Sequence, residues 1–547
     1  MNERLKIIAD TITEIDALGV TTPFIGVGDV IKGAIELTVD EQKLNFIVEI
    51  NPQYPFQFHE TETIRFVNSD LLIYNHVNRD GSICVHTLHS SDLKKKLELD
   101  INSLKEWVRK YYINKDADAH YEHIVVPQAS IDGINSVFLF TEVDYTFKKG
   151  QFDFFTYSTT SQGSMYNDKV ITNIVQEFQI NKQSVKCSWS NNYKNFPTKE
   201  GIYLFVETPP VENKRFAVTS WLQMENFVSQ EFLNFLHTLN TSLNGSKRPV
   251  EIPLLIGYKI NDIEIHWEAI RIFTDSFPNY GSKNELTKKF EGKLYNERIN
   301  WSITKNCSYK YFFGRGALHE KITEGNVLII GVGAIGSIVA TTLVRGGCNK
   351  ITLIDYDIKE PENVCRAEYS FVTGINNKVE DLGNTLSSIS PFVEIKYDKH
   401  LFDFAKFAYN NKKRNRELAE IINQYDIIFD CSTDNDVAFI LSQLEINSEL
   451  FNFSTTNHAK EFVCVVKPNS YDWLMKIFSE LNNDMTDLYN PTGCWSPTYK
   501  ASYNDINTLV QYALKQINLT YKNELPLRNF YLSTFFDNGL TIKLNQF

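Results

Sequence analysis

Short runs of apolar residues alternate with helical patterns through the C-terminal part of the chain. Residues 327–330, 351–354 and 427–429 are continuously apolar, as in strands that are buried on both faces. Helical spacing of apolar positions lies between these runs. The alternation predicts a mostly parallel, doubly wound α/β sheet of the Rossmann-like type. The expected strands are 327–330, 351–354, 393–397, 427–429 and 462–466, and the expected helices are 335–344 and 381–389.

Residues 1–115 predict a compact α+β domain. Apolar residues near helical spacing at the start of the chain indicate an opening helix. Alternating strands are expected at 33–39 and 44–50, followed by a short strand at 63–67 and a helix at 102–112. A helix, a few strands, a loop and a second helix in so short a segment are typical of an α+β unit.

Residues 124–300 contain short aromatic and β-branched runs separated by polar turns, which predicts a strand-rich domain. We find no chemical motif there and interpret this domain as a spacer or docking surface. The polar stretch 114–120 is a candidate linker, and a third domain is expected over 309–547. The predicted chain is therefore multidomain, with an α+β, a strand-rich and an α/β part in that order.

Composition agrees with this division. The chain has 547 residues, which at roughly 150 residues per domain corresponds to three or four domains. Hydrophobic residues make up 43% and charged residues 22%, values that exclude a disordered chain. The formal net charge of -12 argues against nonspecific nucleic-acid binding and against docking on an anionic membrane.

Cysteine usage and the first residues indicate a soluble, cytoplasmic, reduced protein. Eight cysteines without any C-x-x-C pair are too sparse for a disulfide scaffold and do not form a zinc-ribbon pattern. Acidic residues interrupt what would be the apolar core of a signal peptide. The uncharged stretch 327–344 contains three glycines, so it favours a strand, a turn and a helix over a membrane span.

Gly331, Gly333 and Gly336 follow an expected strand and open an expected helix. Glycines let the backbone turn tightly, and the free N–H groups at the helix start then face a phosphate. Asp355 ends the next strand, where its carboxylate can accept hydrogen bonds from a ribose hydroxyl. The combination predicts a nucleotide site; the alternative is a tight strand–helix turn without a ligand.

Polar groups after the second strand favour a triphosphate over the dinucleotide of a dehydrogenase. This stretch carries Asp357, Asn363, Arg366 and Lys378. A triphosphate needs cations, and its magnesium ion needs a carboxylate. Asp430 and Asp434 follow a later strand, at the edge where ligands bind in such sheets.

The motif series GVGAIG, LIDYDIKEPENVCR, GINNK and IIFDCSTDN resembles the adenylating core of ubiquitin-activating enzymes and their ThiF- and MoeB-type bacterial relatives. That family binds ATP with magnesium and converts a partner protein's C-terminal carboxylate to an acyl-adenylate. The resemblance implies that Asp355 holds the ribose, that Asn363, Arg366 and Lys378 bind phosphates, and that Asp434 serves the metal. It also implies that Arg315, in the run FGRG, reaches the partner subunit's phosphates in a homodimer. The 374–378 and 430–434 spacings are each one residue longer than in the family.

Cys494 lies in NPTGCWSPT, between two Pro-Thr pairs and beside a glycine, which predicts an exposed loop. A thiolate attacks an acyl-adenylate readily. The segment resembles the G-C-W-x-P-T loop of bacterial activating domains, which implies that Cys494 forms the first thioester. We interpret the other cysteines of this part as packing residues: Cys348, Cys365, Cys431 and Cys464.

The run IYNHVNRDGSICVH at 73–86 resembles the active-site loop of ubiquitin-conjugating enzymes, and YPF at 54–56 fits the same family. The resemblance implies that Cys84 receives the acyl group, that His76 is the family's histidine and that the Asn78 amide stabilises an oxyanion. Val77 stands where the family has proline, and the loop is two residues shorter. His86 and His89 lie near enough in sequence to act as bases, with surface histidines as the alternative. The alternative for the cysteine is a half-buried thiol in a turn.

A conjugating-like and an activating-like part in one chain are similar to the CD-NTase-associated fusion enzymes of bacterial antiphage operons. The implied partners are a protein with an activated C-terminus, of nucleotidyltransferase or ubiquitin-like type, and an acceptor protein that offers a lysine. The alternatives are an NAD-type oxidoreductase, a non-catalytic nucleotide-binding scaffold, and an activating enzyme whose N-terminal domain is inactive.

Overall fold

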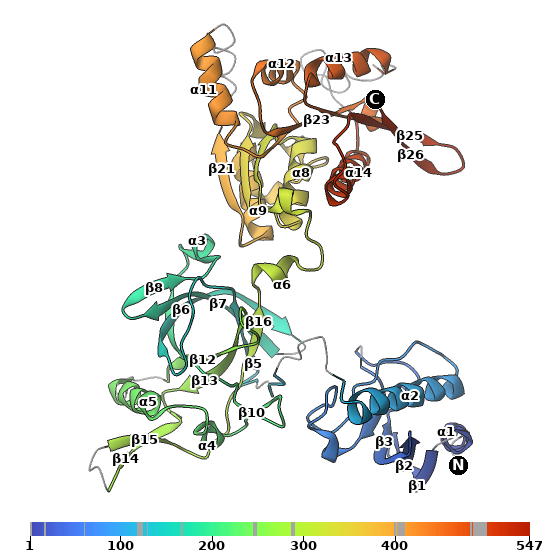
Figure 1. Ribbon diagram of the computed structural model, residues 1–547, viewed down its shortest axis with the longest axis vertical. Coiled ribbons are helices and arrows are strands. Elements are labelled where there is room, and N and C mark those ends of the chain that lie inside the picture. The colour runs from blue at the N-terminus through green and yellow to red at the C-terminus, as the bar shows by residue number, and fades with distance from the viewer. Residues whose placement is uncertain are drawn as a thin grey trace.

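The computed structural model describes residues 3–15, 18–59, 61–116, 124–127, 130–165, 168–243, 249–285, 290–398, 401, 411–481, 484 and 500–547. Three groups of elements follow one another along the chain, each with its own hydrophobic core. We name them the N-terminal unit (3–116), the middle unit (124–306) and the C-terminal unit (309–547). Figure 1 shows that the middle unit adjoins both of the others.

The N-terminal unit is a four-stranded antiparallel sheet, in the order β1-β2-β3-β4, with one helix before it and one after it. Every second residue of β2 is buried, because apolar or small residues alternate with polar ones along its sequence. These residues share one core with apolar side chains of both helices. The elements are α1 (Glu3–Glu14), β1 (Leu18–Val27), β2 (Val30–Val39), β3 (Gln42–Ile50), β4 (Ile64–Val67), α2 (Leu93–Trp107) and a π-helical turn (Val108–Ile113).

Two features of this unit differ from the sequence-based expectation. Strand β1 was not predicted, because most of its residues are exposed and carry no alternating apolar signal. Helix α2 was expected from 102 but begins at Leu93, where the Asp92 carboxylate accepts a hydrogen bond from Lys95 N and caps the helix.

A buried ion cluster joins α2 to the segment before β4. Lys96 Nζ donates to Glu62 Oε2 at 2.8 Å and to Asp100 Oδ1 at 2.7 Å, and all three side chains are at most 5% exposed. Burial raises the pKa of Glu62, but hydrogen bonds led by that from Lys96 outweigh it and leave the pKa lowered. Thr87 Oγ1 also donates to Asp100 Oδ1, at 2.5 Å. The cluster therefore anchors the chain three residues after Cys84.

The middle unit is a sheet that closes on itself, in the order β13-β12-β9-β6-β7-β5-β16 with β8 added to β7. Its ends meet where Ile270 of β13 pairs with Trp301, and where Ser302 N donates to Ala269 O at 2.8 Å. Helix α5 packs against one face of the sheet, so that face is the outside. The other face is the interior, filled by aromatic residues that include Phe147, Phe155, Phe178, Tyr203 and Trp267.

The bounds of the middle unit's elements are as follows: β5 (Ile134–Phe140), β6 (Phe152–Met165), β7 (Asp168–Ile180), β8 (Gln183–Lys186), α3 (Ser190–Tyr193), β9 (Lys199–Phe205), β10 (Val211–Glu212), β11 (Phe216–Ala217), α4 (Trp221–Met224), α5 (Gln230–Leu243), β12 (Glu251–Lys259), β13 (Ile265–Phe273), β14 (Asn279–Lys283), β15 (Phe290–Leu294) and β16 (Ile303–Asn306). The strand-rich character expected from the sequence is confirmed. Its closure into a barrel was not predicted, because pairing between the first and last strands leaves no local signal.

The C-terminal unit is built on a sheet in the order β21-β18-β17-β22-β23-β24-β25-β26. Neighbours from β21 to β23 are parallel, and those from β23 to β26 are antiparallel. The elements are α6 (Tyr309–Phe313), α7 (Glu320–Thr323), β17 (Asn326–Ile330), α8 (Ala334–Arg345), β18 (Lys350–Ile354), β19 (Ile358–Lys359), β20 (Asn376–Asn377), α9 (Lys378–Ile389), β21 (Glu394–Asp398), α11 (Lys412–Ile422), β22 (Ile427–Asp430), α12 (Asn435–Gln443), β23 (Glu449–Thr456), β24 (Glu461–Val466), α13 (Ser470–Glu480), α14 (Tyr503–Lys522), β25 (Phe530–Phe536) and β26 (Leu540–Gln546).

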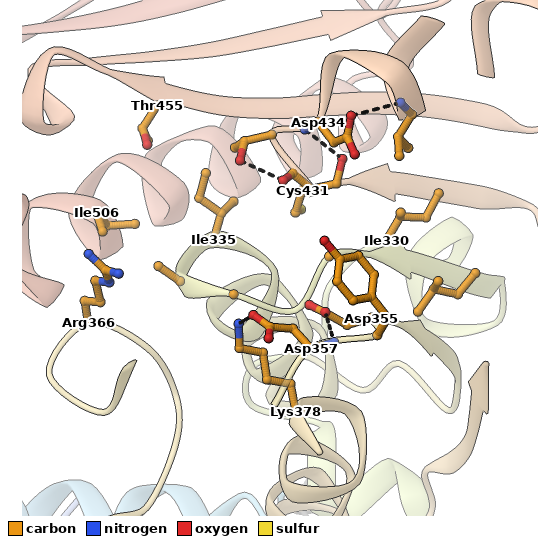
Figure 2. Close-up of a pocket in the computed structure, with 18 residues that line it drawn as sticks. Ile330, Ile335, Asp355, Asp357, Arg366, Lys378, Cys431, Asp434, Thr455 and Ile506 are labelled. Carbon is orange, nitrogen blue, oxygen red and sulfur yellow. Dashed lines mark hydrogen bonds and ion pairs between the residues drawn. The ribbon is translucent and has the colours of Figure 1, made fainter. Parts of the chain in front are cut away.

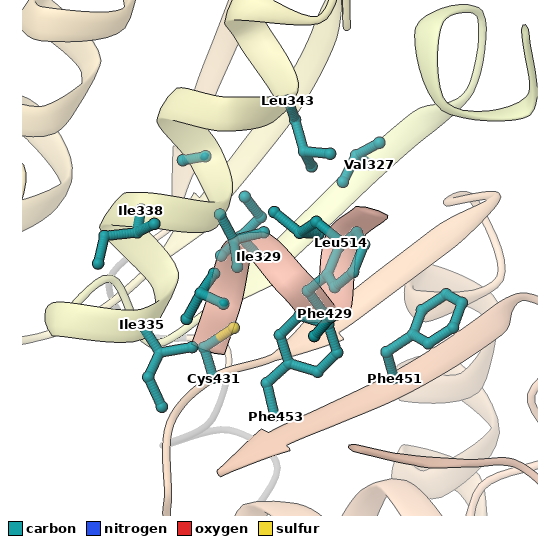
Figure 3. Close-up of a cluster of buried hydrophobic side chains, with 14 of the residues drawn as sticks. Val327, Ile329, Ile335, Ile338, Leu343, Phe429, Cys431, Phe451, Phe453 and Leu514 are labelled. Carbon is teal, nitrogen blue, oxygen red and sulfur yellow. The ribbon is translucent and has the colours of Figure 1, made fainter. Parts of the chain in front are cut away.

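Helices cover both faces of the parallel strands, which explains why these strands are continuously apolar. Val327 and Ile329 of β17 share a core with α8, α9 and α14, part of which Figure 3 shows. Leu328 and Ile330 point to the opposite face and share a core with α11 and α12. The mostly parallel, doubly wound arrangement expected from the sequence is therefore present, with an antiparallel extension. No helix among the described residues is long and apolar enough to span a membrane.

We expect Lys96→Ala to destabilise α2 by about 3–5 kcal/mol, because it leaves the Glu62 and Asp100 carboxylates buried without their cation. Amide hydrogen exchange along α2 measures this loss as a fall in the free energy of opening. Lys95→Ala is the matched control, since the neighbouring Lys95 side chain is exposed. Equal exchange rates in the two variants would contradict a stabilising role for the cluster.

Candidate nucleotide site and cysteine loop

A cavity of about 410 Å³ lies at the carboxyl ends of β17, β18 and β22. Figure 2 shows side chains from these three strand ends converging on it, with Arg366 and Ile506 on one side. Most of the residues that the sequence pattern selected are in its lining: Gly331, Gly333, Asp355, Asp357, Arg366, Lys378 and Asp434. The carboxyl edge of a parallel sheet is where such folds bind ligands.

The three glycines of the turn have different structural roles. Gly331 has φ +77°, and a Cβ there would lie 2.5 Å from Ser432 Cα, so only glycine fits. A Cβ on Gly336 would lie 1.9 Å from Gly331 O. The start of α8 can therefore pack closely against the turn only with glycine at this position. A Cβ on Gly333 would meet no protein atom within 4 Å. Gly333 therefore leaves room on the cavity side, beside the first N–H groups of α8.

Asp355 stabilises the glycine turn through hydrogen bonds. Its Oδ2 accepts a hydrogen bond from Val332 N at 2.8 Å, and its Oδ1 accepts one from Asp357 N at 2.9 Å. A carboxylate has about four acceptor positions, so these bonds leave capacity for a ligand hydroxyl. The residue at the end of β18 thus fixes the turn and also faces the cavity.

Two cationic side chains, Arg366 and Lys378, line the cavity. Lys378, at the start of α9, forms an ion pair of 2.5 Å with Asp357, and its side chain is 11% exposed. Arg366 lies to one side of this pair, near Ile506 (Figure 2). Asn363 lies outside the described lining, and its Oδ1 accepts a hydrogen bond from Glu360 N at 3.0 Å. Arg315 is exposed in the turn after α6 and likewise lies outside the described lining.

Asp430, the last residue of β22, and Asp434, which follows the strand, occupy different environments. Asp430 is buried and accepts hydrogen bonds from Ser432 Oγ at 2.6 Å and from Asn452 Nδ2 at 2.7 Å. Burial raises the pKa of Asp430 above its ordinary value, although these bonds oppose the shift. Asp434 caps α12 by accepting from Asp436 N at 2.8 Å, and it lines the cavity. Asp430 therefore holds the turn, and of these two aspartates Asp434 is the one in the cavity lining.

Within the described residues no group of three or more His, Cys, Asp or Glu side chains is placed to hold a metal ion. A magnesium ion is commonly held by one or two carboxylates together with phosphate oxygens of the substrate. Asp434 is such a carboxylate in the cavity lining, so the lining fits a magnesium ion that takes its other ligands from a phosphate and from water.

Several lining residues were not selected from the sequence: Tyr356, Ser432, Thr433, Thr455 and Ile506. Thr455 lies near the end of β23, the parallel neighbour of β22, so recognising that strand would have pointed to it. Ile506 belongs to α14, far along the chain, and its sequence carries no signal of this position.

Residues 308–459 match the ThiF family. The chain is 26% identical over 370 residues to the ATP-dependent ubiquitin transferase-like protein Cap2 of Enterobacter hormaechei subsp. hoffmannii (strain UCI 50), a match that covers 61% of this chain and 59% of Cap2. The chain therefore carries a ThiF-type domain and resembles the Cap2 fusion.

Shorter matches involve two further relatives. Ubiquitin-like modifier-activating enzyme 5 of Caenorhabditis elegans is 32% identical over 24% of this chain and 31% of its own length. The molybdopterin-synthase adenylyltransferase of Escherichia coli (strain K12) is 32% identical over 21% of this chain and 42% of its own length. The chain thus spans less than two thirds of each of these relatives. Among solved structures, E. coli MccB with ATP aligns over 42% of this chain and 65% of MccB, at 16% identity and a TM-score of 0.30.

The cysteines of the ThiF-type domain and its surroundings separate into two groups. Cys348, Cys431 and Cys464 are buried as expected, and burial raises their pKa values, that of Cys348 to about 12. Cys365 is exposed, so its interpretation as a packing residue was wrong. It follows a short 3₁₀ turn, and its Sγ donates to Glu362 O at 3.1 Å. Cys494 lies outside the described residues.

Cys84 is half-buried in the N-terminal unit, on a loop held by short-range hydrogen bonds. Its N–H donates to His76 O at 2.8 Å, and Asn78 Nδ2 donates to Ser82 Oγ at 3.0 Å. Gly81 has φ +81°, and a Cβ there would lie 2.9 Å from Ser69 N. The tight turn of the loop therefore needs glycine at that position.

The histidines near Cys84 differ in their contacts. The Cys84 Sγ lies 3.3 Å from His86 Nε2, within hydrogen-bond distance. His89 instead stacks on Phe56 with ring centroids 5.9 Å apart, and the His76 ring lies 4.7 Å from that of Tyr111. Of these three, His86 is the one placed to accept the thiol proton.

We expect Gly333→Ala to fold normally but to lower affinity for a fluorescent ATP analogue by at least about tenfold, because the new methyl group enters the cavity. Gly331→Ala should instead lose about 1–3 kcal/mol of stability through backbone strain. Gly539→Ala is a control, since a Cβ there also meets no protein atom within 4 Å. Thermal unfolding and analogue titration separate these effects, and unchanged binding by Gly333→Ala would contradict this location for the nucleotide.

We expect His86→Gln to slow alkylation of Cys84 by iodoacetamide near pH 7 by roughly tenfold, because the imidazole no longer accepts the thiol proton. Peptide mass spectrometry follows the reaction at Cys84 alone. His89→Gln serves as the control, because the His89 ring stacks on Phe56. If both variants react at the rate of the unaltered chain, His86 does not activate this thiol.

Proposed function

We propose that this chain activates the C-terminal carboxylate of a protein with ATP and transfers it, through two cysteines, to an amine. The observation that carries the proposal is the cavity, which is lined by a glycine turn, two cationic side chains and three carboxylates, all within the ThiF match. The names of the relatives support the same chemistry, since they describe an ATP-dependent transferase, a modifier-activating enzyme and an adenylyltransferase.

In the first step, a carboxylate oxygen of the partner attacks the α-phosphorus of ATP, and pyrophosphate leaves. The start of α8, Arg366 and Lys378 would bind the phosphates, and Asp355 would hold the ribose. A magnesium ion at Asp434 would neutralise charge on the leaving pyrophosphate. Lys378 would exchange its ion pair with Asp357 for a phosphate contact, and Asn363 would reach the phosphates only after a change of its turn.

In the second step, the Cys494 thiolate attacks the acyl carbon and AMP leaves. The Cys84 thiolate then attacks the same carbon and releases the thiolate of Cys494. Thioester exchange is close to isoenergetic, so the task of the protein is to position the two sulfurs. Finally an acceptor lysine amine attacks, Cys84 leaves as a thiolate, and the amine loses a proton as the amide forms.

We further propose that the N-terminal unit is a ubiquitin-conjugating-like domain. Its order of helix, antiparallel sheet, loop with Cys84 and helix supports this, and so does the contact between Cys84 and His86. In this proposal the Asn78 amide would leave Ser82 and donate to the oxyanion that develops at the thioester carbon. The functional division of the chain would be 1–115, 124–300 and 309–547.

The proposal extends to partners. The activated protein would be of ubiquitin-like or nucleotidyltransferase type, and the resemblance to CD-NTase-associated fusion enzymes suggests a role in antiphage signalling. Arg315 is exposed outside the described lining of its own cavity, which supports a homodimer in which it would serve the partner subunit's cavity.

Pyrophosphate–ATP exchange that depends on a candidate carrier protein tests the activation step. Asp434→Asn should lower the exchange rate by about 100-fold or more, because asparagine still caps α12 but brings no negative charge to the metal. Unchanged exchange would refute the metal role of Asp434. Carrier-independent hydride transfer to NAD, with no exchange, would favour an oxidoreductase instead.

Trapping of reducible adducts with the carrier and ATP tests the transfer step. Cys84→Ala should accumulate a thioester on Cys494 and stop ligation, whereas Cys494→Ala should form neither thioester. Cys365→Ala is the control, since Cys365 is exposed and has no part in the proposed transfer. Normal ligation by Cys84→Ala would show that the N-terminal unit takes no part in the transfer.

A further inference from the structure

The middle unit forms hydrogen bonds with the loop that carries Cys84, residues 73–86. The contact comes from the hairpin β10–β11, whose tight turn contains Asn213 and Lys214, both with positive φ. Arg215 follows this turn directly and is 7% exposed, and the next residue, Phe216, is 2% exposed. A buried guanidinium requires several acceptors, and these acceptors belong to the N-terminal unit.

Arg215 binds two backbone carbonyls of the Cys84 loop. Its Nη2 donates to Tyr74 O at 2.5 Å and to Val77 O at 2.6 Å. Charged donors form the stronger class of hydrogen bond, and two acceptors on one guanidinium also fix direction. The positions of these carbonyls on either side of His76 are therefore set by a residue of another unit.

The loop makes a reciprocal contact with the hairpin. Arg79 Nη2 donates to Ala217 O at 3.0 Å. Both guanidinium groups lie over the Phe216 ring, with Cζ 5.1 Å from its centroid for Arg215 and 5.9 Å for Arg79. Phe216 therefore attracts both positive charges by cation–π contacts.

The gripped segment is the one on which Cys84 depends. Val77 forms a bridge with Ile83, and Cys84 N donates to His76 O at 2.8 Å. A displacement of Val77 would thus move the backbone to which Ile83 and Cys84 are hydrogen-bonded. The Trp107 indole, from α2, donates to Asn75 O at 2.9 Å and fixes the other side of the same segment.

The middle unit also contacts the C-terminal unit, at α3. Asn192 Nδ2 donates to Pro391 O, and Trp189 stacks on Phe392 with ring centroids 6.2 Å apart. The middle unit therefore contacts both of the other units (Figure 1). It contacts the ThiF-type domain at α3, and it contacts the Cys84 loop at the hairpin β10–β11.

We propose that Arg215 is a positioning residue for Cys84, and that the middle unit holds the cysteine loop in the conformation that accepts an acyl group. The part of this inference that concerns acyl transfer rests on the proposed function. The part that concerns the conformation of the loop does not. It gives the strand-rich unit, which carries no chemical motif, a direct part in the reaction.

The test compares Arg215→Ala, Arg215→Lys and the control Lys214→Ala, whose side chain is exposed at the hairpin turn. Three quantities are measured: amide hydrogen exchange of residues 74–84, transfer of the carrier from Cys494 to Cys84, and carrier-dependent pyrophosphate exchange. For Arg215→Ala we expect exchange at the Cys84 amide to rise, and transfer to slow, by about tenfold or more. Pyrophosphate exchange and the protection of β2 and β3 should not change.

Arg215→Lys keeps the positive charge and should recover part of both losses, which a general loss of structure would not allow. It also provides the measurement if Arg215→Ala does not fold. Unaltered exchange at Cys84 together with unaltered transfer in Arg215→Ala would overturn the inference, and so would the same result in Arg215→Lys if Arg215→Ala does not fold. If the unaltered chain forms no thioester on Cys84, the proposed function fails, while hydrogen exchange at Cys84 still decides whether Arg215 positions the loop.

Discussion

The site depends on one close approach between two loops. The turn after β17 lies against the turn after β22, and a single methyl group on Gly331 would come within 2.5 Å of Ser432 Cα. Because nothing larger than hydrogen separates the two backbones, the first turn of α8 and the Asp434 carboxylate face the same cavity. Polar groups from strands far apart in sequence can act on one ligand only while this approach is maintained.

Acidic residues around the cavity divide into those that hold the backbone and those that face the ligand space. Asp355 accepts from two backbone N–H groups and Asp430 accepts from Ser432 and Asn452, so both fix the loops. Asp434 combines a helix cap with a place in the lining. Loops held by such internal hydrogen bonds need less ordering when a ligand binds, which lowers the entropic cost of binding.

Local sequence signals predicted the parts of the site that depend on local chemistry. The glycine turn, the strand ends and the aspartates were identified because tight turns and buried strands restrict residue type. Thr455 and Ile506 were missed, because their places in the lining depend on which strands and helices become neighbours. Barrel closure and the burial of Arg215 were not predicted for the same reason. In each, the contacting residues are far apart in sequence: Ile270 pairs with Trp301, and Arg215 donates to Val77 O.

The grip on the Cys84 loop limits how an acyl group can travel between the units. Arg215 of the hairpin binds the loop, and Arg79 of the loop binds the hairpin, so the N-terminal unit cannot turn on the barrel without breaking contacts of its cysteine loop. The barrel also meets the C-terminal unit, through the side-chain hydrogen bond of Asn192 to Pro391 O, through stacking of Trp189 on Phe392, and through Tyr309 N, which donates to Glu142 Oε2 at 3.2 Å. Two cysteines on one chain gain effective concentration only if the geometry lets them meet. If the two sulfurs meet as proposed, the barrel and the N-terminal unit would therefore approach the ThiF-type domain as one body.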